Sequence, residues 1–165
     1  MERIFFSKLN PNAIIPQKRI EDAGYDIYAC INDSHIIMQP HETKLIPTGI
    51  ASACSPKYYF QLQERGSTGT RGIGQRCGVI DSGYRGEWFI PITNHNTVPL
   101  CLINPKSTSL PNLDLFEGIV YDLGKAIAQA VLLPVPEVQI EELSYEDLCL
   151  MKSDRMFGKV GSSQK

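Results

Sequence analysis

The sequence lacks long hydrophobic runs and a sustained helical spacing of apolar residues. About 18 consecutive apolar residues would be needed to span a membrane, and none occur here. The early apolar run at residues 4–6 is too short for a signal peptide. We therefore expect a soluble protein with no membrane partner, located in the cytoplasm or, in a eukaryotic host, also in the nucleus.

Paired cysteines and clustered histidines are also lacking. The five cysteines lie far apart, their number is odd and no Cys-x-x-Cys pair occurs. The three histidines have no His or Cys at metal-ligand spacing. A disulfide framework and a zinc site are therefore not expected, and free thiols packed as small hydrophobes are predicted instead.

A basic excess is missing over the chain as a whole, whose formal net charge is −2. This balance argues against a nucleic-acid partner, because a general nucleic-acid surface needs an excess of positive charge. Only the last residues are locally basic, with Lys152, Arg155, Lys159 and Lys165 against Asp154. Such a tail suits a small polyanion such as a triphosphate, and it equally suits a solvated end without a ligand.

Short apolar segments are what the chain does contain. Eleven prolines and thirteen glycines divide its 165 residues into runs of about 4 to 8 residues, which is typical of a β-sandwich or barrel. We expect one domain over 1–150, all-β with at most one or two short helices, and a flexible arm over 151–165. Ser144 and Asp147 stand at capping-box spacing before a short helix through Leu150, although a strand is nearly as compatible.

The most distinctive segment is 78–90, where two apolar runs flank a Ser82-Gly83 turn. This pattern predicts a β-hairpin. Asp81 and Tyr84 bracket the turn, and Gly78 and Gly86 allow another group to approach the backbone closely. Asp81 and Tyr84 are therefore candidates for ligand binding, or simply a turn former and a packed aromatic residue.

Three further segments carry polar groups beside strands. The stretch 64–72 is rich in Gly, Ser and Thr and contains Arg65, all suited to binding phosphate, although a plain polar loop has the same composition. Asp26 lies on the face of a predicted strand opposite Ile27. Gln129 shares a face with apolar neighbours in the strand near 130, so its amide needs a partner from a ligand or a nearby loop.

In this order, these segments resemble the five motifs of the trimeric dUTPase family, over residues 2–165. Ala23-Gly24-Tyr25-Asp26 resembles motif one, the Arg65 stretch motif two, 78–86 motif three, Lys125-Ala126-Ile127-Ala128-Gln129 motif four and 155–164 motif five. Several positions depart from the family. Gly66 replaces the motif-two Ser, with Ser67 one place later; Gly83 replaces the second Asp of motif three; Lys125 replaces an Arg; and Val160 replaces the Phe that stacks on the base.

The resemblance implies a jelly-roll-like β protomer in a homotrimer whose active sites lie at subunit boundaries, each completed by another chain's motif five. It further implies hydrolysis of dUTP to dUMP and pyrophosphate with Mg²⁺, which keeps uracil out of DNA and supplies dUMP for thymidylate synthesis. Asp81 would activate the attacking water, Tyr84 would exclude a 2′-hydroxyl, and Asp26 would hold the metal mostly through water. The implied substrate contacts are, for the uracil, Gln75, Gly78, Val79, Ile80 and Val160 and, for the phosphates, Arg65, Gly66, Ser67, Gln129, Arg155, Gly161, Ser162 and Ser163.

Three other interpretations stay open at this point. A non-catalytic nucleotide-binding regulator would accommodate the departures at Gly66 and Val160. A related dCTP deaminase is disfavoured, because Pro91 stands where those enzymes carry a catalytic Glu and cannot transfer a proton. A purely structural jelly-roll protein would have no reason to keep Asp81, Arg65 and Gln129 in this register. No role is assigned to the polar insertion at 104–116.

Overall fold

The computed structural model describes residues 2–109 and 111–153, and in them β-strands predominate. The strands are β1 (Phe5–Lys8), β2 (Gly24–Ile27), β3 (His35–Met38), β4 (Thr43–Pro47), β5 (Ile50–Ala53), β6 (Tyr58–Gln63), β7 (Ile73–Gln75), β8 (Val79–Ile80), β9 (Phe89–Asn94), β10 (Leu100–Ile103), β11 (Ile119–Asp122) and β12 (Ala128–Pro134). The helices are α1 (Gly66–Gly69) and α2 (Tyr145–Leu150). The predicted all-β fold with two short helices is confirmed.

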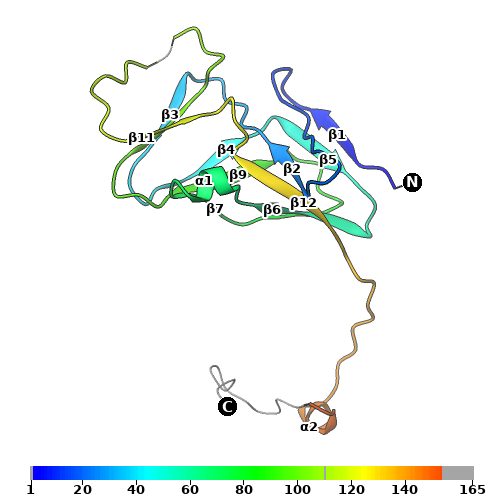
Figure 1. Ribbon diagram of the computed structural model, residues 1–165. Helices are drawn as coiled ribbons and strands as arrows, with labels where there is room; N and C mark the ends of the chain where they lie inside the picture. The colour runs from blue at the N-terminus through cyan, green and yellow to red at the C-terminus, as the bar shows by residue number, and fades with distance from the viewer. Residues whose placement is uncertain (1, 110, 154–165) are drawn as a thin grey trace.

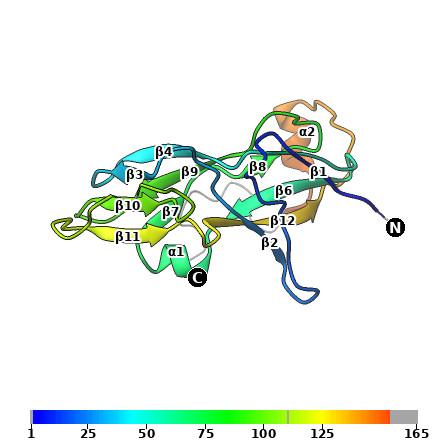
Figure 2. The ribbon, with the colours of Figure 1, turned by 90° about the horizontal axis from the view of Figure 1, so that it is seen from above.

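The described strands form four small sheets that enclose one core (Figure 1). Their strand orders are β1-β5, β11-β10-β3, β2-β12-β6-β8 and β4-β9-β7. Seen from above, the β11-β10-β3 and β4-β9-β7 sheets occupy one end of the molecule, and the other two occupy the opposite end (Figure 2). The four-stranded sheet matters most for function, because three of the candidate motifs lie on it or at its edge.

In β6, alternating residues contribute to the core, as expected for a strand with one buried face. Phe60 and Leu62 on β6 are buried, and the residues beside them in the chain are more exposed. Phe60 packs edge to face against Trp88 at a ring-centroid distance of 5.1 Å. Phe6 completes this group, 5.6 Å from Phe60 and 5.7 Å from Trp88. The aromatic group thus anchors the segment that follows the Asp81 turn to the four-stranded sheet.

Two predicted strand pairings are wrong. The runs at 78–80 and 88–93 do not pair with one another, since β8 pairs with β6 whereas β9 pairs with β4 and β7. The sequence also favours a pair of strands at 36–38 and 44–50 around a turn at 39–42, but β3 pairs with β10 and β4 pairs with β9. In both cases the turn is present but the strands on either side of it enter different sheets.

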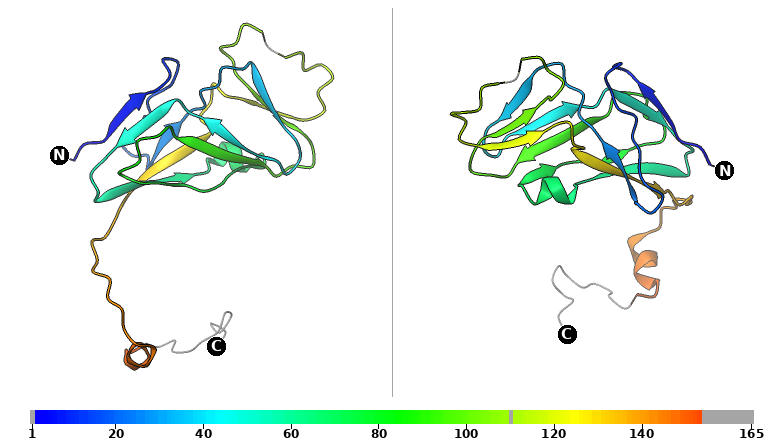
Figure 3. Two further views of the ribbon diagram at one scale, coloured as in Figure 1. Left: turned by 180° about the vertical axis from the view of Figure 1, so that it is seen from behind. Right: turned by 45° about the horizontal axis from the view of Figure 1, so that its top comes forward.

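The chain leaves the β domain after β12 and extends away from it before reaching α2 (Figures 1 and 3). No α2 residue is buried, and Leu148 and Leu150 are largely exposed. The predicted cap is present, because Ser144 Oγ accepts a hydrogen bond of 3.0 Å from the Asp147 N–H. This segment therefore makes its local structure without packing on its own β domain.

Other described features complete the fold. The 104–116 insertion links the parallel strands β10 and β11, with no regular element in its described residues. All five cysteines are free thiols, as predicted; Cys101 is buried and Cys77 is exposed. Burial raises the pKa of the Cys101 thiol, so that group stays protonated near neutral pH. In the part of the chain that the structure describes, no helix is long and apolar enough to cross a membrane.

Candidate functional site

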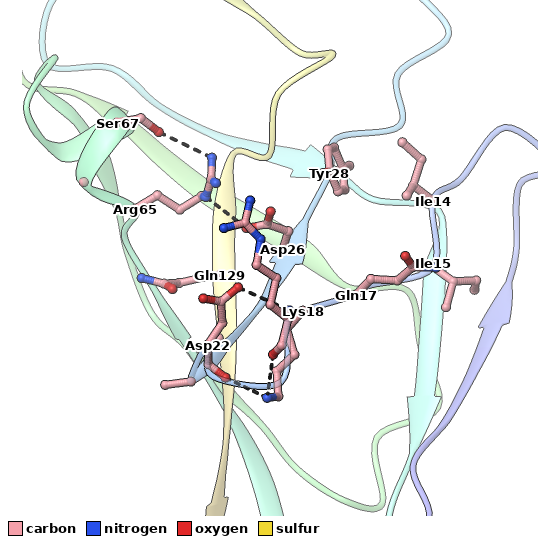
Figure 4. A pocket seen from close by; sticks show the side chains of 14 residues that line it. Ile14, Ile15, Gln17, Lys18, Asp22, Asp26, Tyr28, Arg65, Ser67 and Gln129 are labelled. Carbon is pink, nitrogen blue, oxygen red and sulfur yellow. Dashed lines mark hydrogen bonds and ion pairs between the residues drawn. The ribbon is translucent and has the colours of Figure 1, made fainter.

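An open pocket of about 810 Å³ collects the candidate residues of three distant segments (Figure 4). Asp26 comes from β2, Arg65, Gly66 and Ser67 come from the start of α1, and Gln129 comes from β12. They are separated by up to about a hundred residues in the sequence, so their meeting is a product of the fold. The pocket brings together one carboxylate, one guanidinium, one amide and one hydroxyl.

Strand register places Asp26 and Gln129 beside one another. They are directly opposite in the antiparallel pair of β2 and β12, and Gln129 is in turn opposite Gln63 on β6. The Gln129 Nε2 donates a 2.7 Å hydrogen bond to the Glu64 carbonyl, so the expected loop partner for this amide exists. Gly24 is needed nearby, because a Cβ there would overlap the Gln129 side chain. Gln129 is thereby fixed with its amide at the pocket.

Arg65 points from α1 toward Asp26 across the pocket (Figure 4). Its Nε lies 3.1 Å from Asp26 Oδ1, and the two side chains are 29% and 38% exposed. One terminal nitrogen of Arg65 also donates to the Ala126 carbonyl at 3.2 Å and to Ser67 Oγ at 3.4 Å. The guanidinium is therefore held at the pocket by a carboxylate and two oxygen acceptors, while part of it stays open to solvent.

The backbone of Arg65 is held in place by Thr68, a buried residue of α1 that is only 1% exposed to solvent. Thr68 Oγ1 accepts a bond from the Arg65 N–H at 3.2 Å and donates to the Arg65 carbonyl at 3.0 Å. Gly66 and Ser67 lie between these two residues, and both line the pocket. A Cβ added at Gly66 would meet no atom within 4 Å, so the space that a serine side chain would need at this position is free.

Sequence reasoning missed one wall of this pocket, the loop between β1 and β2. Gln17, Lys18, Arg19 and Asp22 line the pocket together with the motif residues. The Lys18 Nζ closes the loop by donating to the carbonyls of Asp22 at 2.6 Å and Arg19 at 3.2 Å. The sequence contains one hint of this wall, the basic pair Lys18-Arg19 shortly before Ala23-Gly24, because a connecting loop does not itself need two positive charges.

The segment before β8 turns sharply, as its glycine suggested. Cys77 has φ of +60° and Gly78 has φ of +152°. A Cβ at Gly78 would come within 2.6 Å of Gln61 Nε2 and 2.9 Å of the Leu62 carbonyl oxygen, so only glycine fits against β6. The group that approaches Gly78 closely is thus β6 of the same chain, and the expected approach of a ligand stays a prediction. Val79, next along, is 60% exposed, and Ile80 packs partly against the core.

Asp81 and Tyr84 are presented at the surface by the turn that follows β8. The Tyr84 N–H donates to the Asp81 carbonyl at 3.1 Å, which closes the turn. Among the described residues, the Asp81 carboxylate has no hydrogen bond or ion pair, and Tyr84 is 43% exposed. Gln75, by contrast, donates through Nε2 to the Cys77 carbonyl at 3.0 Å, so its amide braces the approach to β8.

Asp81 does not reach the pocket within one chain. Asp26 lies on β2 and Asp81 follows β8, the two outer strands of the β2-β12-β6-β8 sheet. With strands about 4.8 Å apart and residues about 3.3 Å apart along them, the register places the Cα atoms of Asp26 and Asp81 roughly 20 Å from one another. Neither Asp81 nor Tyr84 lines the pocket. Within the described chain, the pocket and the Asp81 turn are therefore separate.

The pocket fits a hard cation only in part. Oxygen ligands of the kind Mg²⁺ prefers are supplied by Asp26, with Asp22 as a second carboxylate in the wall. Among residues 2–109 and 111–153, no three His, Cys, Asp or Glu side chains come together as a metal cluster. A cation held here would take most of its ligands from water and from substrate, as Mg²⁺ often does.

The remaining predicted site residues, Arg155, Val160, Gly161, Ser162 and Ser163, lie outside the described residues.

Comparison with known proteins gives concordant matches. The dUTPase family model matches residues 10–104. Deoxyuridine 5′-triphosphate nucleotidohydrolases are similar over most of the chain: that of Gloeobacter violaceus is 34% identical, covering 86% of this chain and 82% of the relative, and that of Nautilia profundicola is 32% identical over 99% of both. That of Leptospira interrogans is 40% identical, covering 56% of this chain and 66% of the relative.

Solved structures of dUTPases are also similar to this chain. A point mutant of the dUTPase of Staphylococcus bacteriophage 80alpha, in complex with dUpNHpp, is 25% identical with a TM-score of 0.73, and the match covers 98% of each chain. A second structure of that phage dUTPase with dUPNHPP has a TM-score of 0.76 at 23% identity, covering 99% of each chain. These similarities confirm the jelly-roll-like fold that the sequence predicts.

Proposed function

The chain belongs to the dUTPase family, and from that premise we propose that it hydrolyses dUTP to dUMP and pyrophosphate. Membership confirms the family resemblance and the enzyme class, dUTP diphosphatase, that the sequence predicts. The observation that carries the proposal is the convergence of Asp26, Arg65, Ser67 and Gln129 on one pocket, since these are the residues matched to motifs one, two and four.

The phosphates are assigned to this pocket. Arg65 offers guanidinium N–H groups that suit phosphate oxygens, and Ser67 and Gln129 add a hydroxyl and an amide beside it. Gly66 leaves room for a phosphate oxygen to approach the backbone. Together these groups would hold the triphosphate in one orientation, which is the main contribution that positioning makes to phosphoryl transfer.

Mg²⁺ is the proposed cofactor, held by Asp26 largely through water. When bound it would neutralise part of the charge on the phosphates. The Asp26–Arg65 pair already places opposite charges side by side at the pocket. Asp26 would therefore face the cation and Arg65 the phosphate oxygens, so that one substrate complex uses both charges.

Asp81 is the proposed general base. Its carboxylate is exposed and uncommitted among the described residues, as a group that must accept a proton from water requires. The oxygen of that water would bond to the α-phosphorus while the bond to the pyrophosphate oxygen breaks, and the proton would go to Asp81. Tyr84, three residues on, would lie against the sugar and leave no space for a 2′-hydroxyl. Main-chain groups of Gly78, Val79 and Ile80, with Gln75 behind them, would bind the uracil edge.

A homotrimer would unite the pocket of one chain with the Asp81 turn of another. Because Asp81 lies roughly 20 Å from Asp26 in one chain, a complete site needs the Asp81 turn of a second copy beside the pocket of the first. Leu45 and Phe89 are exposed apolar residues on the paired strands β4 and β9, which suits a subunit interface. The extended segment after β12 offers a route by which residues Arg155 and Val160 to Ser163 would reach another subunit's substrate.

In a cell this activity would keep uracil out of DNA and supply dUMP for thymidylate synthesis, and we place the enzyme in the cytoplasm. No nucleic-acid or membrane partner is proposed.

A nucleotide panel tests the proposed function. Pyrophosphate release would be followed with dUTP, dTTP, UTP and dCTP, with and without Mg²⁺. We expect turnover of dUTP alone and its loss on chelation of the metal. Binding of dUTP without turnover would instead support the regulator, and ammonia release from dCTP would support a deaminase.

A further inference from the structure

Arg85, which lies just past the Asp81–Tyr84 turn, donates side-chain hydrogen bonds to three backbone carbonyls. One terminal nitrogen, Nη1, donates to the carbonyls of Ser82 at 2.6 Å and Tyr84 at 3.2 Å, both in the turn. The same nitrogen lies 3.3 Å from the carbonyl of Ser52, a buried residue on β5. The guanidinium therefore joins the turn to a strand that is 33 residues away in the sequence.

The two ends of this segment are fixed by other contacts. On the early side, β8 pairs with β6. On the late side, Glu87 Oε1 accepts a 2.7 Å bond from the Gly49 N–H, and the Trp88 N–H donates to the Ile50 carbonyl at 2.9 Å. Residues 81–86 lie between these anchors without strand partners. Arg85 is the side chain that connects this middle part to the sheet.

Tyr84 is held in one orientation by the same segment. Its hydroxyl donates to the Glu87 carbonyl at 3.0 Å. The ring lies against Gly86, where an added Cβ would be 2.5 Å from the hydroxyl oxygen and 2.6 Å from Cζ. The carbonyl of Tyr84 itself is bound by Arg85. The position of the Tyr84 ring therefore depends on where the backbone at residues 84–87 is placed.

We propose that Arg85 is a positioning residue, which fixes the Asp81 carboxylate and the Tyr84 ring relative to the sheet and so sets both turnover and the rejection of ribonucleotides. This inference rests on the proposed function. In this role Arg85 acts through the backbone, because its Nη1 donates to the carbonyls of Ser52, Ser82 and Tyr84. Its loss would allow the turn to move, and a misplacement of about 1 Å is enough to cost roughly 10²-fold in rate.

The test compares Arg85→Ala, Arg85→Lys and, as a matched control, Arg3→Ala, which removes a guanidinium far from the turn in the sequence. For each variant, kcat/KM is measured with dUTP and with UTP. We expect Arg85→Ala to lower kcat for dUTP by about 10- to 100-fold. The ratio of kcat/KM for dUTP to kcat/KM for UTP should fall by roughly tenfold at least. Arg85→Lys should recover part of both, since an ammonium can still donate to these carbonyls, and Arg3→Ala should match the parent.

A second measurement does not depend on activity. Hydrogen exchange of the backbone amides in residues 81–87 is compared between the parent and Arg85→Ala without nucleotide. Faster exchange in this segment, with unchanged melting temperature, is expected. The proposed role of Arg85 would be overturned by unchanged amide exchange in residues 81–87. It would also be overturned if kcat falls while the ratio of kcat/KM for dUTP to kcat/KM for UTP stays the same. If the parent protein does not turn over dUTP, the proposed function fails, and the exchange result alone decides whether Arg85 fixes the turn.

Discussion

Arg65 Nε lies 3.1 Å from Asp26 Oδ1, so a cation and an anion from different motifs neutralise one another at the mouth of the pocket. Both side chains are partly exposed, and an ion pair of this kind contributes little to stability, at most about 1 kcal/mol. In the proposed substrate complex, Asp26 would face the metal ion and Arg65 would face the triphosphate. This arrangement, and the separate turn that carries Asp81, give rise to four predictions about variants.

Replacing Asp26 with Asn should raise the Mg²⁺ concentration needed for half-maximal turnover by severalfold or more, because the carboxylate proposed to face the cation is lost. A Mg²⁺ titration of dUTP hydrolysis measures this shift. Asp114→Asn, which removes an exposed carboxylate from the 104–116 insertion, serves as the control and should behave like the parent. An unchanged Mg²⁺ requirement in Asp26→Asn would remove Asp26 from the metal site.

Replacing Asp81 with Asn should lower kcat by about 10²- to 10⁴-fold, because an amide cannot accept the proton of the attacking water. The dissociation constant of dUTP should change much less, since no binding group is truncated. Quenched-flow turnover and calorimetric titration with a non-hydrolysable analogue separate these effects. Retained turnover would contradict the assignment of Asp81 as general base.

Ser67 should take the part that the motif-two serine plays in the family. Its hydroxyl lines the pocket and accepts a bond from Arg65, so we expect Ser67→Ala to lower kcat by roughly tenfold or more, as removal of a transition-state hydrogen-bond donor does. Because position 66 has open space, adding Gly66→Ser to Ser67→Ala should restore part of the rate. Steady-state kinetics of the two variants decide the matter, and a Ser67→Ala enzyme as fast as the parent would count against Ser67.

Deleting residues 155–165 should slow turnover by about 10²-fold or more, because Arg155 and the glycines and serines of motif five are proposed to close over the phosphates. The melting temperature should stay within a few degrees of the parent, since the buried core residues of the described chain fall between Ala13 and Ala130. Calorimetry and kinetics on the shortened protein test both points. A loss of stability like that of a core substitution would show the tail to be structural.

The local sequence predicted which polar residues line the pocket better than it predicted which strands pair with one another. Asp26 and Gln129 were identified by their motifs, and the alternation of their strands agrees with the faces they occupy. The hairpin predicted around Asp81 failed because the Trp88 N–H bonds to Ile50 and the flanking strands join different sheets. That choice depends on contacts far apart in the chain, which a turn flanked by apolar runs does not encode.

The lining loop at residues 17–22 was missed for a related reason. Lys18 and Arg19 carry no motif, and only the folding of β2 against β12 brings them to the pocket. Arg85 was overlooked as well. Its proposed role depends on hydrogen bonds to backbone carbonyls, and because every residue has a carbonyl, the sequence does not indicate which ones an arginine will bind. The departures at Gly66 and Gly83 were visible in the sequence, but only the structure shows that space is free at both positions.

The proposed division of the active site between the pocket of one chain and the Asp81 turn of another has a genetic consequence. A chain defective at Asp26 still carries a sound Asp81 turn, and a chain defective at Asp81 still carries a sound pocket. In the proposed trimer, some mixed assemblies of the two variants would contain an intact pocket beside an intact Asp81 turn, so two impaired alleles should restore part of the activity when they are expressed in the same cell.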